Sequence, residues 1–144
     1  MTTTRDRFTA DHRALEAQLE ALDNAVEGAN FPTIQAAWAP FERALLEHLE
    51  VEEAEALPGF VAAHPEAGEA IRADHAAIRR WLAELGVAGD LHTLRKDRHD
   101  DFLALLREHR EREEATFYPW VDEAPEGLAR RLLAALRQRR GGGA

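Results

Sequence analysis

Apolar residues recur at intervals of three and four along most of the chain, which is the spacing of residues on one face of an α-helix. The first helix is expected to begin at Thr9 or Asp11, and the fourth to be capped by Asp90 and ended by Pro119. Pro40 falls inside the second helix, where we expect a kink or a restart because proline removes a backbone hydrogen bond. The pattern predicts five helices, at about residues 9–28, 33–57, 65–86, 90–119 and 126–138.

Four long helices joined by short loops are typical of an up-down-up-down bundle. The predicted fold is therefore all-α: a four-helix bundle followed by a short C-terminal helix. An abundance of Ala, Leu, Glu and Arg favours the same class. We expect residues 1–140 to form one domain, and the sequence GGGA at 141–144 to be a flexible tail.

The 144-residue chain has no cysteine, which excludes disulfide scaffolds, thiolate zinc sites, iron–sulfur clusters and cysteine nucleophiles. A formal net charge of −9 argues against nucleic-acid binding, which requires a basic surface. The sequence lacks a long apolar run and a signal-peptide core, so we expect a cytoplasmic protein that does not engage a membrane. Only the segment 126–140 is rich in Arg, and we expect it to dock onto the acidic bundle.

Two motifs occur twice in the chain. His48 begins HLEVEEAEALP and His109 begins HREREEATFYP, which share the pattern H-x-E-x-E-E-A-x-x-x-P. Asp-His pairs at 11–12 and 74–75 begin DHRALEAQLEAL and DHAAIRRWLAEL. The chain is therefore interpreted as two copies of a helical hairpin, packed as one bundle about a pseudo-twofold axis.

Helix geometry indicates which acidic residues lie beside the repeated histidines. Each residue advances about 100° around a helix, so position i+4 lies about 40° from position i and one turn along. Glu52 therefore shares a face with His48, and Glu113 shares one with His109. The repeated set predicted to point inward comprises His12, His48, Glu52, His75, His109 and Glu113.

This inward set is flanked by apolar residues, so its two carboxylates would be buried. A buried carboxylate must be neutralised, hydrogen-bonded or bound to a cation. Two divalent metals would balance the charge, and imidazole with carboxylate suits iron, manganese or zinc. If each metal takes two His and both Glu bridge, a bridging hydroxide or oxide still leaves an open position. The apolar wall favours a small guest such as dioxygen, nitric oxide or peroxide, and the spacing does not choose among them.

The doubled Asp-His and His-x-x-x-Glu motifs resemble those of the hemerythrin-like (HHE cation-binding) family, over roughly residues 5–120. The resemblance implies a non-haem di-iron centre with an oxo or hydroxo bridge, in which Mn or Zn can substitute for Fe. It implies a protein that binds or senses dioxygen or nitric oxide, together with a redox partner protein. The implied ligands are terminal imidazoles of His12, His48, His75 and His109, and bridging carboxylates of Glu52 and Glu113.

Arg79 stands where the oxygen-carrying hemerythrins place a fifth His, so the chain is similar instead to bacterial His-Glu variants. Those variants are linked to gas or redox sensing, iron handling and peroxide chemistry. Three alternatives therefore remain: a di-iron enzyme acting on peroxide or nitric oxide, an iron-responsive regulator, and a metal-free bundle with a hydrogen-bonded polar core.

Other polar residues near these positions are assigned structural roles. Glu16 and Arg79 occupy equivalent positions in the two copies and are expected to form an ion pair. Asp11 and Asp74 are interpreted as helix caps, with hydrogen bonding to ligand residues as the alternative. Tyr118 falls about 180° from His109 on a regular helix and is expected to serve packing.

The remaining histidines and the tryptophans are not expected to act as ligands. His64 and His92 are predicted to be solvated, and His99 to lie off the face that carries His109. Glu50 and Glu111, two residues after a repeated His, are predicted to be solvated as well. The tryptophans lie off the His face and are predicted to pack between helices; they are Trp38, Trp81 and Trp120.

Overall fold

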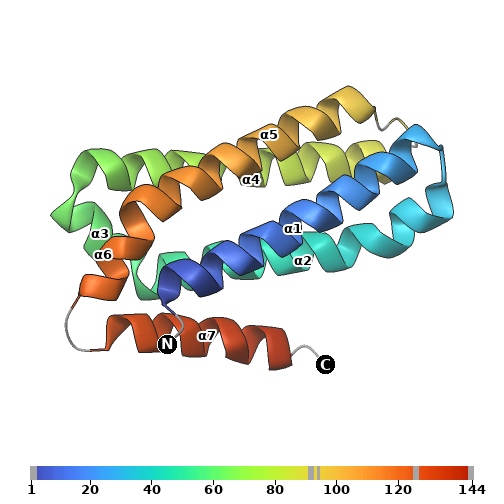
Figure 1. Cartoon of the computed structure of the whole chain (residues 1–144). Helices are drawn as coiled ribbons and strands as arrows, with labels where there is room; N and C mark the ends of the chain where they lie inside the picture. The colour runs from blue at the N-terminus through green and yellow to red at the C-terminus, as the bar shows by residue number, and fades with distance from the viewer. Residues whose placement is uncertain (1–2, 91–92, 94, 125–126, 143–144) are drawn as a thin grey trace.

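The computed structural model describes residues 3–90, 93, 95–124 and 127–142 (Figure 1). It confirms the all-α, up-down-up-down four-helix bundle, whose long helices are α1 (Thr4–Glu27), α2 (Phe31–Glu55), α4 (Pro65–Asp90) and α5 (Lys96–Arg112). Each long helix packs against two of the others, so the four enclose a common core. The shorter elements are α3 (Leu57–Ala63), the π-helix η1 (Glu113–Phe117), α6 (Tyr118–Glu123) and α7 (Leu128–Gly142).

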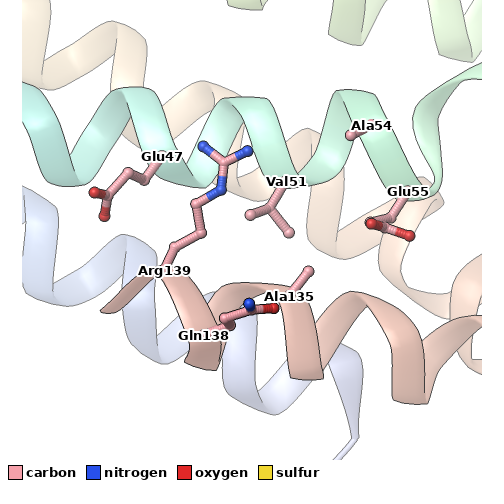
Figure 2. Close-up of a pocket in the computed structure, with 7 residues that line it drawn as sticks. All are labelled: Glu47, Val51, Ala54, Glu55, Ala135, Gln138 and Arg139. Carbon is pink, nitrogen blue, oxygen red and sulfur yellow. The ribbon is translucent and has the colours of Figure 1, made fainter. Parts of the chain in front are cut away.

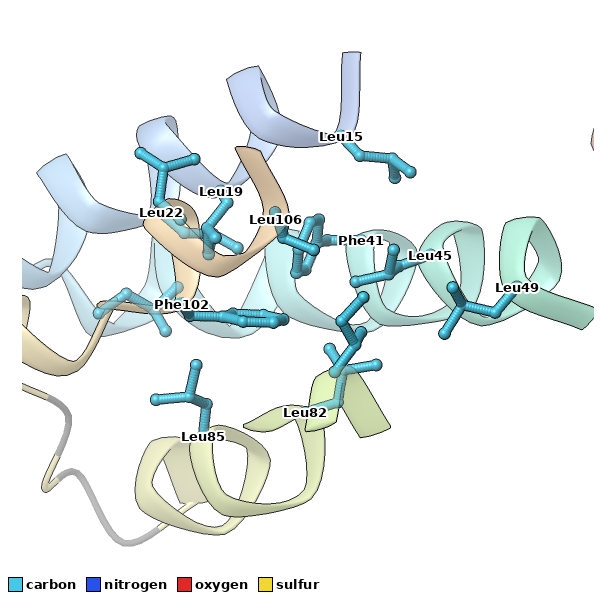
Figure 3. Close-up of a cluster of buried hydrophobic side chains, with 13 residues drawn as sticks. Leu15, Leu19, Leu22, Phe41, Leu45, Leu49, Leu82, Leu85, Phe102 and Leu106 are labelled. Carbon is cyan, nitrogen blue, oxygen red and sulfur yellow. The ribbon is translucent and has the colours of Figure 1, made fainter. Parts of the chain in front are cut away.

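The core consists of two apolar clusters, one toward each end of the bundle. The first contains Phe41 and Phe102, whose ring centroids lie 6.4 Å apart (Figure 3). The second contains Phe60 and Phe117 and includes residues from α3, α6 and α7. On α1 the sequence passes from the second cluster at Phe8 to the first at Leu15. The part of α1 between Phe8 and Leu15 therefore lies at the boundary of the two clusters.

The first helix begins earlier than predicted. Thr3 accepts a hydrogen bond from the Asp6 backbone N–H, and Asp6 accepts one from the Thr3 N–H, which together form a capping box. Asp122 of α6 also accepts a bond from the Thr4 N–H at 2.8 Å. Because these caps satisfy the orphan amides, α1 starts at Thr4, and Asp11 lies inside the helix instead of at its start.

The predicted helix ends also need correction. α2 continues through Pro40 without a restart, ends at Glu55, and is followed directly by α3 with Pro58 in its first turn, where proline is tolerated. α4 continues past Gly86 to Asp90. Asp90 therefore ends one helix and does not cap the next, which begins at Lys96 after Arg95.

The fourth long helix does not stop at Pro119. A π-helix at Glu113–Phe117 connects α5 to α6, and Pro119 lies in the first turn of α6. The chain thus stays helical to Glu123, and the π-helix changes which residues after Glu113 face the core.

The Arg-rich segment docks onto the bundle, as predicted. Helix α7 packs against α2 and α1, and its Leu132 is fully buried. Arg139 forms an ion pair with Glu50 of α2. A cavity of about 510 Å³ lies between α2 and α7, and Val51 of α2 and Ala135 of α7 line it (Figure 2). Helix α7 includes the first two glycines of the predicted tail, and residues 143–144 lie outside the described residues.

None of the helices in the described part of the chain is both long enough and apolar enough to span a bilayer.

Candidate metal centre

The six residues predicted to point inward meet at the boundary of the two apolar clusters. Each is at most 1 % exposed, although they come from α1, α2, α4, α5 and η1. Their side-chain nitrogen and oxygen atoms form two groups within which all atoms lie within 4.8 Å of one another. The first half-site is His12, His48, Glu52 and Glu113; the second half-site is Glu52, His75, His109 and Glu113.

Glu52 connects the two half-sites. Its Oε2 lies 3.0 Å from His48 Nε2 of the first half-site, and its Oε1 lies 3.0 Å from His75 Nε2 of the second. The two oxygens of one carboxylate thus face imidazoles of different hairpins, which is the arrangement of a bridging carboxylate.

Glu113 connects them as well. Its Oε1 lies 2.8 Å from His12 Nε2 and 2.9 Å from His109 Nε2, and its Oε2 lies 3.6 Å from His75 Nε2. The sequence folds in this way because His109 and Glu113 lie one turn apart on the same face, at the junction of α5 and η1. Both glutamates are therefore shared by the two half-sites.

Asp11 and Asp74 hydrogen-bond to ligand-type residues and do not cap helices. Asp11 Oδ2 accepts from His48 Nδ1 at 2.6 Å, and Asp74 Oδ2 accepts from His109 Nδ1 at 2.9 Å. The cap interpretation was wrong because both aspartates lie well inside α1 and α4. A proton held on Nδ1 leaves Nε2 as the ring atom directed to the centre, which is how carboxylates orient metal-binding imidazoles.

The predicted ion pair between Glu16 and Arg79 does not form. Arg79 donates to both oxygens of Glu53, at 2.6 and 2.8 Å, and Glu53 also accepts from the Nδ1 of His75 at 2.8 Å. Glu16 instead accepts a hydrogen bond of 2.8 Å from Arg110. The prediction failed because Arg79 packs beside α2 and Glu16 packs beside α5. Each side chain therefore forms its ion pair with a residue of that adjacent helix.

Burial and neighbouring charges give the centre unusual protonation equilibria. Burial lowers the pKa of His48, but the negative charges of Glu52 and Asp11 outweigh it and raise that pKa to about 10. Burial and the nearby His48 lower the pKa of His12 to about 4. Burial raises the pKa of Glu113, yet its contacts with imidazoles bring it well below the ordinary value. Glu113 is thus ionised in the core, and an ionised core carboxylate requires a positive partner.

The second half-site contains buried polar atoms that lie close together without forming hydrogen bonds. Glu52 Oε1, His75 Nε2, His109 Nε2 and Glu113 Oε2 are all buried, and their close contacts do not have the geometry of a hydrogen bond among the described residues. Each of the four residues contributes one such atom. Buried polar groups are seldom left unsatisfied, so four that converge indicate a site for a cation. The residues present therefore fit a metal.

The position of Tyr118 differs from the prediction. Its hydroxyl oxygen lies inside the first half-site, 2.5 Å from Glu52 Oε2 and 2.8 Å from Glu113 Oε1. The same oxygen lies 3.0 Å from His12 Nε2 and 3.3 Å from His48 Nε2. Sequence reasoning therefore missed a residue at the middle of the centre.

The π-helix explains the error. In η1 the Tyr118 backbone N–H donates to the Glu113 carbonyl, an i→i+5 bond that puts one extra residue in the turn. The extra residue turns Tyr118 by about 100° relative to a regular helix, from the far side toward the site. The sequence carries no evident signal for this widened turn.

The remaining assignments are mostly confirmed. His64, Glu50 and Glu111 are exposed, while His92 lies outside the described residues. His99 is buried away from the centre, with its Nδ1 2.9 Å from Asp23 Oδ1.

The tryptophans pack against aromatic rings of the core, as predicted. Trp81 stacks on Phe102 with a centroid separation of 5.8 Å, and Trp38 lies at the same distance from Phe41. Trp120 contacts Phe60 at 5.4 Å.

Four helices around a buried centre of paired His and Glu residues define a cation-binding helical bundle. Comparison with protein families matches residues 3–121 to the hemerythrin HHE cation binding domain. The chain therefore belongs to the hemerythrin HHE cation-binding family, and α7 lies beyond the matched region. Comparisons with curated proteins and with solved structures gave no match.

Proposed function

We propose that the protein is a non-haem di-iron protein that binds or senses a small ligand such as dioxygen or nitric oxide. The observation that carries this proposal is the pair of half-sites, each built from two imidazoles and both shared carboxylates. Each glutamate faces imidazoles of both hairpins, as two adjacent metal ions require.

The ligand set supports iron. Imidazole and carboxylate suit iron, manganese and zinc, and the two anionic glutamates fit divalent ions better than monovalent ones. Bound iron would supply Lewis acidity and one-electron redox chemistry. The chain's own contribution is to orient the imidazoles: Asp11 and Asp74 hold the Nδ1 atoms of His48 and His109, so the Nε2 atoms face the centre.

The surroundings support a small, weakly polar guest. The Phe8 ring lies 5.1 Å from the His48 ring, and the apolar clusters that contain Leu45 and Ile71 lie on the two sides of the centre. Such walls favour a small guest over a large polar substrate, and they accept a diatomic molecule.

Metal content tests the first part of the proposal. Protein purified without chelator from iron-supplied cells should contain about two irons per chain by elemental mass spectrometry. A content near zero in a fully helical protein would contradict the proposal and favour a hydrogen-bonded polar core.

A gas titration tests the second part. The reduced, iron-loaded protein should change its absorption spectrum on exposure to dioxygen or nitric oxide and recover when the gas is removed. A change that does not reverse, together with peroxide turnover faster than that of free iron, would favour the di-iron enzyme instead. Zinc-loaded protein is the control, because Zn²⁺ has no redox chemistry.

A further inference from the structure

The Tyr118 hydroxyl contacts every residue of the first half-site. Its oxygen lies 2.5 to 3.3 Å from one ligand-type atom of each of His12, His48, Glu52 and Glu113. We infer that Tyr118 is a fifth protein ligand of the metal ion in the first half-site, bound through its phenolic oxygen. This inference rests on the proposed function, because it requires the half-site to hold a metal.

Hydrogen bonding alone does not account for these contacts. A tyrosine hydroxyl has one proton to donate and accepts at most two hydrogen bonds. Four neighbours within 3.3 Å exceed that capacity. Four ligand-type atoms around a central point are instead the arrangement of a coordination sphere.

The available space leads to the same conclusion. A metal ion binds imidazole nitrogen and carboxylate oxygen at about 2.0–2.2 Å, so it must lie among the same four atoms that surround the hydroxyl. The phenolic oxygen then either binds the ion or leaves the half-site.

Packing prevents Tyr118 from leaving. The residue is fully buried, and its ring centroid lies 5.3 Å from that of Phe8 and 5.6 Å from that of Phe117. Its backbone is fixed by the hydrogen bond from its N–H to the Glu113 carbonyl in the π-helix. Moving the hydroxyl out of the half-site would require unpacking the end of the bundle. Coordination needs only a small shift and the loss of the hydroxyl proton, which ligand groups release when a metal binds.

The two half-sites consequently differ, although their sequence motifs match. Tyr118 aligns with Leu57 in the first copy, and Leu57 is a buried member of an apolar cluster at the start of α3. The first half-site thus has five protein donors and the second has four. The open position therefore belongs to the second half-site, beside His75 and His109, and a guest binds there.

The test uses a spectroscopic property of tyrosine bound to iron(III). Metal-free protein is loaded with two equivalents of iron(II), oxidised with ferricyanide, and measured by visible absorption and resonance Raman spectroscopy. Tyrosinate bound to iron(III) gives a charge-transfer band with enhanced ring modes. Because Tyr118 is the only tyrosine in the chain, any such signal reports this residue.

The wild-type protein should show the tyrosinate signal, and Tyr118→Phe should lose it completely while keeping two irons. Tyr118→Leu, which copies the residue of the other half, should give the same result if Phe perturbs the fold. Azide, used as a probe anion, should bind without removing the ring modes, because it occupies the second half-site.

Two results would overturn the inference. One is a wild-type protein with two irons and no tyrosinate signal, which would leave the proposed function intact. The other is one iron in the wild type and two in Tyr118→Phe, which would show that the hydroxyl keeps metal out of the first half-site. A protein that binds no iron at all would instead contradict the proposed function itself.

Discussion

Asp11 Oδ2 lies 2.6 Å from His48 Nδ1, so a carboxylate that precedes one repeated histidine fixes the orientation of another. Asp74 and His109 repeat this relationship in the second hairpin at 2.9 Å. The doubled Asp-His motif therefore serves two functions: His12 and His75 point into the centre, and the preceding aspartates hold the histidines of the adjacent helices.

Asp11→Asn should weaken metal binding without preventing it. The amide oxygen can still accept from His48 Nδ1, but it lacks the negative charge that makes the imidazole a better ligand. Loss of such an outer partner typically lowers metal affinity by about 10–100-fold. Competition with a chelator measures the affinity, and Asp101→Asn, at an exposed position of α5, is the matched control. Equal affinities in the two variants would contradict the role of Asp11.

His48→Ala and Glu113→Ala should lower the number of metal ions bound per chain, whereas Glu50→Ala and Glu111→Ala should not. His48 and Glu113 are buried in the centre, while the two control glutamates are exposed on the same helical stretches. We expect the loss of at least one of two metals, since Glu113 belongs to both half-sites. Elemental analysis of the purified variants measures the stoichiometry. Similar losses of metal in all four variants would show that the number of bound metal ions does not depend on whether the substituted side chain faces the core.

Asp23→Asn should change how stability depends on pH. Burial and a hydrogen bond with Asp100 raise the pKa of Asp23 from 3.8 to about 7. The neighbouring His99 does not offset this, because burial lowers its pKa and keeps it neutral. Because the folded protein holds this proton more tightly than the unfolded chain does, protonated Asp23 stabilises the fold. The contribution is complete when the pH is below the pKa of the unfolded chain, and it is lost as the pH rises to about 7.

Thermal denaturation of both proteins from about pH 4 to pH 8 measures this effect. The melting temperature of Asp23→Asn should rise relative to wild type between about pH 4 and pH 7, and the difference should then stay constant. Asp101→Asn, at an exposed site, should show no such trend. A difference that is constant over the whole range would mean that Asp23 titrates normally.

Leu132→Ala should destabilise the fold and leave the metal centre intact. Leu132 of α7 is fully buried, and removing a buried leucine side chain costs about 2–5 kcal/mol. Chemical denaturation measures the free energy of unfolding, and the half-buried Leu133→Ala should cost less. Neither half-site includes a residue of α7, so both variants should keep the wild-type metal content. Loss of metal in Leu132→Ala alone would show that α7 supports the centre.

The sequence was sufficient to predict the four-helix bundle and the six His and Glu residues that lie together in its core. Both depend on local geometry: the apolar period identifies each helix face, and i+4 spacing places Glu52 and Glu113 beside His48 and His109. The doubled motif added the pairing of the two hairpins. The helix faces and the i+4 spacing do not depend on how the helices later pack.

Tertiary structure decided the partners of the other polar residues. Asp11 was predicted to be a cap because the capping box at Thr3, which lies before the predicted start at Thr9 or Asp11, has no apolar period to mark it. Arg79 pairs with Glu53 and not with Glu16 because the two positions pack beside different helices. Tyr118 reaches the centre only because the π-helix adds a residue to one turn. Sequence period predicts which way a side chain points while the helix stays regular; which side chain it meets depends on packing between helices and on where the helical turn widens.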